Sequence, residues 1–303
     1  MTDRVINRRE FLESALAIGA VARLGGQGLA APPSWGGPVL DVHLHLRQSA
    51  DGNFNHIEGS GVTKAVLLAG AGGDDHARSV AAAYPGRFVR FASVEVTQPD
   101  AASLLRTAIG GGAIGFGEIK SHVEAAGPEM RRLYALAAEL DVPVTMHFQE
   151  VTQPGSQGTY NTGLKTFDAV LKAFPHTRFI GHADAFWAHV SADYAEDTAY
   201  PTGRIVPGGV TDTFLSDYAN LYADMSARSC NNFLNRDPDF AAGFLARHQD
   251  KLMFGSDCGC PDGRGTAAGT CIARDTLTAL KKLAAPDVFR KISWENGTRL
   301  LRL

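Results

Sequence analysis

The stretch VLDVHLHL, residues 39–46, is an apolar run that carries two histidines near its end. Four later stretches share this design, a short apolar run that ends near a side chain able to bind a metal ion: GFGEIK (115–120), PVTMHF (143–148), RFIGHAD (178–184) and KLMFGSD (251–257). Imidazoles and carboxylates from strand ends far apart in the chain suit a catalytic metal site, because one short loop rarely supplies an open, asymmetric ligand set. The pattern therefore favours an enzyme.

Strand-like runs and helical patterns alternate from residue 39 to the end of the chain. The strand-like runs are 39–45, 62–69, 88–96, 113–119, 143–148, 177–182, 220–225 and 251–256. Helical patterns are expected at 74–84, 99–109, 128–140, 164–174, 238–248 and 267–283, whereas the first connection, 47–61, is short and polar. Eight such β/α units predict a single-domain α/β fold, a (β/α)8 TIM barrel over 39–303. An open doubly wound sheet is the alternative, but no GxGxxG or GxxxxGK(S/T) motif opens a helix.

The first strand places two imidazoles on one face. His43 and His45 are two residues apart, so both side chains should point into the barrel and take adjacent positions on one ion. His147, His182 and Asp257 stand at later strand ends, which converge at the carboxyl mouth of a barrel. Together these five residues predict a metal centre.

The fourth strand offers two further candidates on one face, Glu118 and Lys120. Glu118 could bridge two ions directly, and Lys120 could do so if its amine were carboxylated. If Glu118 is the ligand, Lys120 is free to hold an anionic substrate. Asp224, near the end of the seventh strand, is expected either to orient a ligand histidine or to cap a loop.

This order of residues resembles the amidohydrolase superfamily: HxH on strand one, Glu or Lys on strand four, His on strands five and six, and Asp on strand eight. FGSD (254–257) and the C-terminal WENGTRLLRL resemble its amidohydrolase-related branch. The resemblance covers 39–303. It implies that His43 and His45 hold a first ion, that His147 and His182 hold a second or orient the substrate, and that Asp257 binds metal and shuttles a proton.

A metal-dependent hydrolase follows from these features, with one or two divalent ions, zinc the expected one. Such an ion lowers the pKa of bound water to about 7, so that hydroxide can attack an ester, lactone or amide while Asp257 accepts a proton. A metal-dependent decarboxylase is the alternative, favoured if Arg47 grips a substrate carboxylate. A third hypothesis is a binding protein that has lost catalytic turnover. This hypothesis does not explain why the sequence retains a general base.

Composition restricts the partners. The chain has 303 residues, 45% of them hydrophobic and 20% charged, enough apolar surface for a full core. Its net charge of −3 and dispersed Lys and Arg residues argue against a nucleic-acid partner. The expected partner is a small-molecule substrate.

The N-terminus resembles an export signal. NRREFL (7–12) is a twin-arginine pattern, followed by a short apolar run and small residues, so residues 1–30 are expected to be a signal peptide and 31–38 a linker. The apolar run is too short for a permanent membrane anchor. These features predict a partner in the twin-arginine export machinery and a periplasmic or secreted location; an ordinary amphipathic helix is the alternative.

Three of the four cysteines, Cys258, Cys260 and Cys271, lie in one glycine-rich segment, and Cys230 stands apart. A bridge from Cys271 to Cys258 or Cys260 would close this segment in an oxidising compartment. Free thiols and metal binding are the other interpretations, although the spacing matches no zinc-finger signature.

The remaining histidines are expected to be surface or helix residues. Phe186 and Trp187 are expected either to line a pocket or to pack on the barrel.

Overall fold

The computed structural model describes residues 33–153, 155, 157–266 and 269–303. The predicted signal peptide and the first two linker residues lie outside them. Within the described ranges, every helix is too short or too polar to cross a bilayer.

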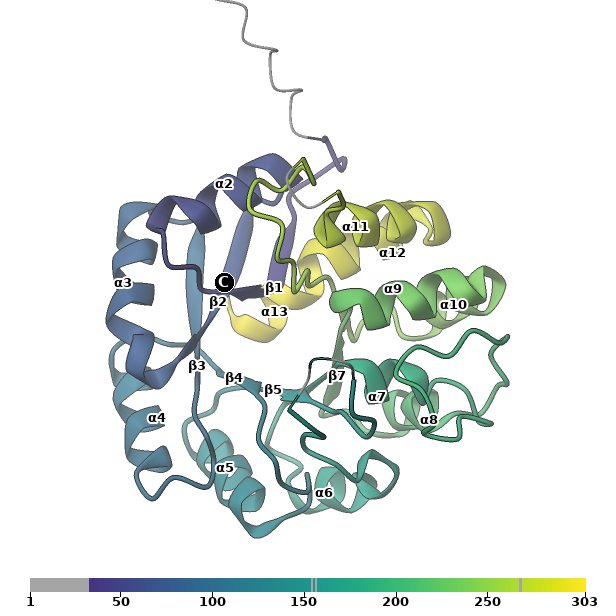
Figure 1. Cartoon of the computed structure of the whole chain (residues 1–303), viewed down its shortest axis with the longest axis horizontal. Helices are drawn as coiled ribbons and strands as arrows, with labels where there is room; N and C mark the ends of the chain where they lie inside the picture. The colour runs from purple at the N-terminus through teal and green to yellow at the C-terminus, as the bar shows by residue number, and fades with distance from the viewer. Residues whose placement is uncertain (1–32, 154, 156, 267–268) are drawn as a thin grey trace, which may run out of the picture. The chain divides into compact units, whose positions relative to one another are not determined.

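Eight parallel strands follow one another around a barrel, each paired with the next in chain order (Figure 1). They are β1 (Leu40–His45), β2 (Lys64–Gly70), β3 (Phe88–Ser93), β4 (Phe116–Ile119), β5 (Val144–His147), β6 (Phe179–His182), β7 (Leu221–Asp224) and β8 (Leu252–Met253). The ring is drawn together between its first and last strands by two backbone hydrogen bonds, Val42 N to Phe254 O (3.0 Å) and Asp257 N to His43 O (2.8 Å). The predicted (β/α)8 barrel is confirmed.

Helices alternate with the strands and surround them in Figure 1. They are α2 (Ala50–Ser60), α3 (Asp74–Ala83), α4 (Ala101–Gly110), α5 (Pro128–Glu139), α6 (Asp168–Ala173), α7 (Asp184–Ala188), α8 (Val210–Asp217), α9 (Ala227–Arg236), α10 (Pro238–Arg247), α11 (Ile272–Leu283), α12 (Pro286–Arg290) and α13 (Asn296–Leu301). The expectation of a helix-free first connection was wrong: α2 forms there despite its two glycines because Ile57, fully buried, packs into the core.

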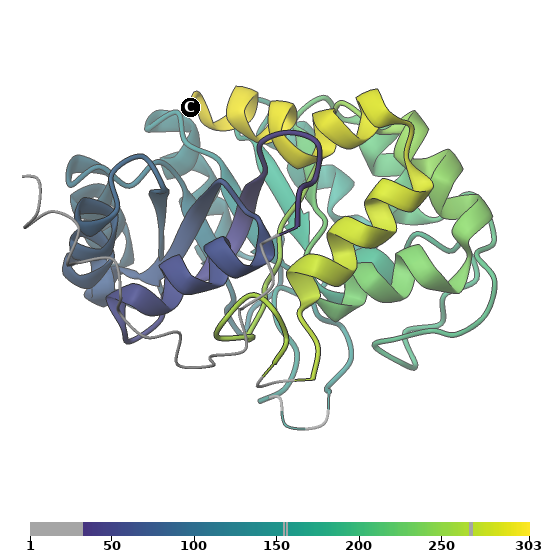
Figure 2. The same ribbon diagram turned by 90° about the horizontal axis from the view of Figure 1, so that it is seen from above.

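The barrel interior is a packed core rather than a channel. Leu40, Val66, Phe91, Ile180 and Met253, from five different strands, belong to one buried cluster. Leu300 and Leu301 of α13 join this cluster. Figure 2 shows α13 on one side of the barrel and the loops after β5 and β8 projecting from the other. His45, His147, His182 and Asp224 are the last residues of β1, β5, β6 and β7, at the carboxyl ends of the strands.

Candidate metal centre

His43, His45 and Asp257 meet where β1 ends beside the segment that follows β8. Asp257 Oδ1 lies 3.2 Å from His45 Nε2 and 3.8 Å from His43 Nε2. His43 is fully buried, whereas 54% of the His45 side chain is exposed. One ligand atom from each of the three lies within 4.8 Å of the others, which is the spacing that a shared cation requires.

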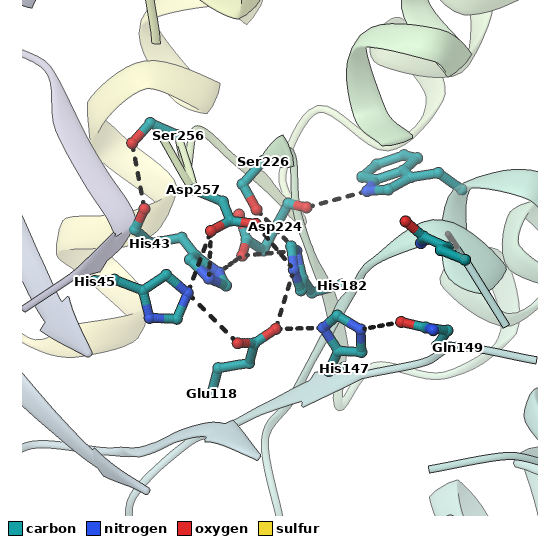
Figure 3. A network of polar contacts seen from close by, with 12 residues as sticks. His43, His45, Glu118, His147, Gln149, His182, Asp224, Ser226, Ser256 and Asp257 are labelled. Carbon is teal, nitrogen blue, oxygen red and sulfur yellow. Dashed lines mark hydrogen bonds and ion pairs between the residues drawn. The ribbon is translucent and has the colours of Figure 1, made fainter. Parts of the chain in front are cut away.

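Glu118 joins this group to a second one formed by His147 and His182. Its Oε1 contacts His147 Nδ1 closely and lies 3.3 Å from His182 Nε2, while its Oε2 lies 3.5 Å from His45 Nε2 (Figure 3). The carboxylate therefore spans the two groups, as a ligand that bridges two ions would. Lys120 lies beside this cluster, with Nζ 4.7 Å from the ring centre of Tyr160.

A second layer of side chains holds the imidazoles in place. His43 Nδ1 donates to Asp224 Oδ2 at 2.6 Å, and His182 Nδ1 lies 2.8 Å from Ser226 Oγ. These contacts leave Nε2 of both rings buried and without a hydrogen-bond partner among the described residues. Buried nitrogens are rarely left unpartnered, so two of them facing the same carboxylates fit a cation between them.

Asp224 thus has the orienting role that was one of its two predicted alternatives. Ser226 was not predicted, because a serine two residues after a strand carries no distinctive spacing. Asp41 was missed as well: its Oδ1 accepts from the backbone N of His43 (3.0 Å) and of Ser256 (2.8 Å), which ties β1 to the segment before Asp257. The sequence does contain a signal for this role: Asp41 is an aspartate within the apolar run that carries the HxH motif.

The backbone around Asp257 is shaped for this arrangement. Asp257 itself adopts a left-handed φ of 46°, which turns its carboxylate back toward β1. Two residues earlier, Gly255 lies against Asp224: a Cβ at that position would be 2.1 Å from Asp224 Oδ1. Residue 255 must therefore be a glycine, because a side chain at this position would collide with Asp224, which orients His43.

The electrostatics of the cluster favour a cation. Burial raises the pKa of Glu118, but His147, His182 and His43 outweigh this and hold the pKa well below its usual value. Burial lowers the pKa of His43, but Asp224, Asp257 and Glu118 outweigh it and raise the pKa to about 10. The carboxylates of this cluster therefore favour a positive charge between them.

Two cavities open beside the cluster. The larger, of about 450 Å³, is lined by residues that include His45, Glu118, Ser93 and Gln98. The smaller, of about 190 Å³, is lined by residues that include His147, His182, Asp257, Asp184 and Tyr200. Lys120 lines both cavities. The space suits a small polar molecule with an anionic group near Lys120.

Arg47 does not face these cavities. Its Nη2 donates to the carbonyl oxygens of Cys258 (2.9 Å) and Cys260 (2.8 Å), so the geometry does not support the predicted grip on a substrate carboxylate. Phe186 and Trp187 are buried, and Trp187 Nε1 donates to the Asp224 carbonyl at 3.2 Å, so these aromatics pack on the barrel.

The remaining histidines were expected at the surface or on helices; His56 lies on α2 as a buried residue, and His189 and His248 are buried at the ends of α7 and α10. His189 Nε2 lies 3.1 Å from Glu196, and His248 Nε2 lies 2.6 Å from Asp212. Both are paired inside the protein away from the metal centre.

Comparisons with known proteins agree with this architecture. The family model described as amidohydrolase matches residues 45–202. A search of curated proteins finds no match. Among solved structures, the chain resembles an Acinetobacter baumannii protein described as a probable 2-pyrone-4,6-dicarboxylic acid hydrolase, with 14% identity, a TM-score of 0.59, and 88% of this chain and 99% of that one covered.

Two further structures illustrate the range of activities on this fold. A Pseudomonas putida protein named for the same hydrolase activity has 12% identity and a TM-score of 0.58, with 88% of this chain and 97% of that one covered. A 2,6-dihydroxybenzoate decarboxylase from Rhizobium has 12% identity and a TM-score of 0.52, with 88% and 98% covered. At such low identity these likenesses show the fold alone.

Proposed function

The chain belongs to the amidohydrolase family, and from this premise we propose that it is a metal-dependent hydrolase that adds water to an ester, lactone or amide. The observation that carries the proposal is the position of Asp257, whose carboxylate lies 3.2 Å from His45 Nε2 and 3.8 Å from His43 Nε2. A carboxylate beside two ligand histidines can both contact an ion and accept a proton from water.

The donor set fits one or two divalent ions, with zinc the expected metal. His43 and His45 would hold one ion with Asp257, and His147 and His182 would hold another, with Glu118 between them. When bound, a divalent ion supplies Lewis acidity, which polarises a carbonyl and makes water ionise near neutral pH. Imidazole and carboxylate ligands of this kind suit zinc.

The residues around the ions divide the remaining work. Asp257 accepts the proton of the attacking water and returns it to the leaving group. Asp224 and Ser226 keep Nε2 of His43 and of His182 directed at the centre. Lys120, exposed between the two cavities, binds an anionic group of the substrate and so fixes the scissile bond near Asp257.

A decarboxylase is the second candidate, because Lys120 supplies the carboxylate-binding cation that Arg47 does not. The same ligands could hold a carboxylic acid substrate without water attack. The decarboxylase among the structural neighbours supports keeping this alternative. Product analysis separates the two: hydrolysis incorporates ¹⁸O from labelled water into the product, whereas decarboxylation releases carbon dioxide.

The test combines metal analysis with a substrate screen. Purified protein is analysed for metal content and assayed over esters, lactones and amides, including 2-pyrone-4,6-dicarboxylic acid, and over carboxylic acids such as 2,6-dihydroxybenzoate. We expect at least one ion per chain, and a loss of turnover by about 10²–10⁴-fold in Asp257→Asn.

Asp239→Asn is the matched control, because that side chain is 95% exposed on α10. Full activity in metal-free protein would overturn the mechanism. Retained turnover in Asp257→Asn would remove Asp257 from its role as general base.

A further inference from the structure

A second group of metal-binding side chains lies outside the metal centre, between α2 and the loop that follows Asp257. His56, Cys260 and Cys271 are all buried, and one ligand atom of each lies within 4.8 Å of the others. His56 comes from α2, Cys260 from the loop, and Cys271 from the residue that precedes α11. The three residues thus come from separate segments and converge in the folded chain.

The tautomer of His56 leaves a nitrogen available. Its Nδ1 lies 2.8 Å from the carbonyl oxygen of Cys260, which only accepts, so Nδ1 carries the proton. Nε2 therefore presents a lone pair, and it is buried without a partner among the described residues.

The two sulfur atoms of the group, on Cys260 and Cys271, lie within 4.8 Å of each other and of a ring nitrogen of His56, as ligands of one ion must. A third thiol is adjacent, because Cys258 Sγ lies 3.9 Å from Cys271 Sγ. Cys260 Sγ accepts a hydrogen bond from the backbone N of Gly265 at 3.1 Å, a contact that stabilises a thiolate, and donates to Asp262 Oδ1 at 3.0 Å, a contact that an ion on the sulfur would replace.

The residues around this group offset the negative charge of the thiolates and hold the loop after Asp257 in place. The guanidinium of Arg47 lies on the carbonyls of Cys258 and Cys260 and offsets the charge of nearby thiolates. The loop approaches α2 so closely that a Cβ at Gly59 would be 1.7 Å from Asp262 O, and one at Gly263 would be 2.0 Å from His56 O. The site is therefore built by tight backbone contact.

We propose that His56 Nε2 and the thiolates of Cys260 and Cys271 bind a structural zinc ion, separate from the ions proposed for the barrel mouth. Each thiol that binds loses its proton to solvent. The ion fastens the loop after β8 to α2. Because Asp257 directly precedes that loop, the ion also restrains the backbone that carries the general base.

Cobalt substitution tests this proposal, because thiolate ligands give Co²⁺ an intense charge-transfer absorption in the near ultraviolet that imidazole and carboxylate ligands do not. We expect full-length protein loaded with Co²⁺ alone to show this absorption. Cys260→Ser should lose most of it and bind one ion fewer per chain. Cys230→Ala, a buried cysteine outside the group, should retain it.

Asp257→Asn separates this site from the metal centre, since it should retain the thiolate absorption while losing turnover. Thiol titration of denatured wild-type protein, with chelator and without reductant, distinguishes a disulfide: four reactive thiols are expected, one for each cysteine of the chain. Two missing thiols would show a disulfide in place of the ion. That result, or Co²⁺-loaded wild-type protein without charge-transfer absorption, would overturn the proposal.

Discussion

At the scale of single residues, Asp224 controls the direction of His43. Its Oδ2 accepts from His43 Nδ1 at 2.6 Å, and both side chains are fully buried. Asp224→Asn keeps the size of the side chain but removes its charge, so the imidazole is held less firmly and is less basic. We expect metal affinity to fall by about 10–100-fold, measured by competition with a chelator.

Asp217→Asn, an exposed aspartate at the end of α8, is the control and should bind metal normally. Unchanged affinity in Asp224→Asn would show that His43 needs no charged partner.

Gly255 gives a second prediction at this scale. Gly255→Ala places a Cβ 2.1 Å from Asp224 Oδ1, so Asp224 must move and His43 with it. We expect metal content and turnover to fall although residue 255 contacts no ligand atom of the ion. Gly259→Ala, which meets nothing within 4 Å, is the matched control. Equal activity in the two variants would refute the expected displacement.

The strand period predicts that HxH and the strand-end side chains lie close together, and the fold brings them together. It could not identify Ser226 or Asp41, because their partners His182 and Ser256 are far from them in the sequence. It could not decide whether Arg47 faces a substrate, because the direction of a long side chain after a strand depends on the loop that it meets.

At the scale of elements, all eight strands were predictable because buried parallel strands are short apolar runs with clear ends. Helix α2 was not, because its sequence is polar and rich in glycine. Only its packing decides the conformation: Ile57 is fully buried, and Asn53 Nδ2 donates to the His45 carbonyl at 2.9 Å. Tertiary contacts outweighed weak helix propensity.

Helices α8 and α10 are joined by a pH-sensitive contact. Asp212 lies 2.7 Å from Arg247 Nη2 and 2.6 Å from His248 Nε2. Burial raises the pKa of Asp212, but these partners outweigh it and lower the pKa below its usual value. A lowered pKa stabilises the folded state above the unfolded value of about 3.9, and this stability is lost as the pH falls through the folded value.

Asp212→Asn should therefore lower the free energy of unfolding by about 1 kcal/mol at neutral pH. The difference from wild type should shrink as the pH falls below about 4. Denaturant unfolding at several pH values measures it. A difference that stays constant down to the acid limit would show that the charge of Asp212 contributes nothing.

At the scale of the whole molecule, the candidate metal centre gathers side chains from β1, β4, β5, β6 and the segment after β8. An ion there would link the first strand to the segment after the last, and the sequence could predict this only from the expected convergence of strand ends. We expect saturating metal, at about 100 times the dissociation constant, to stabilise the fold by about 2.7 kcal/mol. Thermal unfolding with zinc and with chelator measures this, and identical midpoints would contradict it.

Export is a further prediction for the whole chain. The residues that suggest it, Arg8 and Arg9, lie outside the described part of the structure, so it remains a proposal from sequence. Replacing both arginines by lysine should retain the protein in the cytoplasm, as measured by cell fractionation. Unaltered fractionation of that variant would favour the ordinary amphipathic helix.

The position of Lys120 between two cavities has a consequence for inhibitor design. A molecule with a central acidic group could pair with the ammonium and extend one arm into each hollow. Such a two-armed compound would gain contacts with Ser93 and Gln98 on one side and with Tyr200 on the other. Its selectivity would then depend on the walls of the two cavities rather than on the metal-binding side chains.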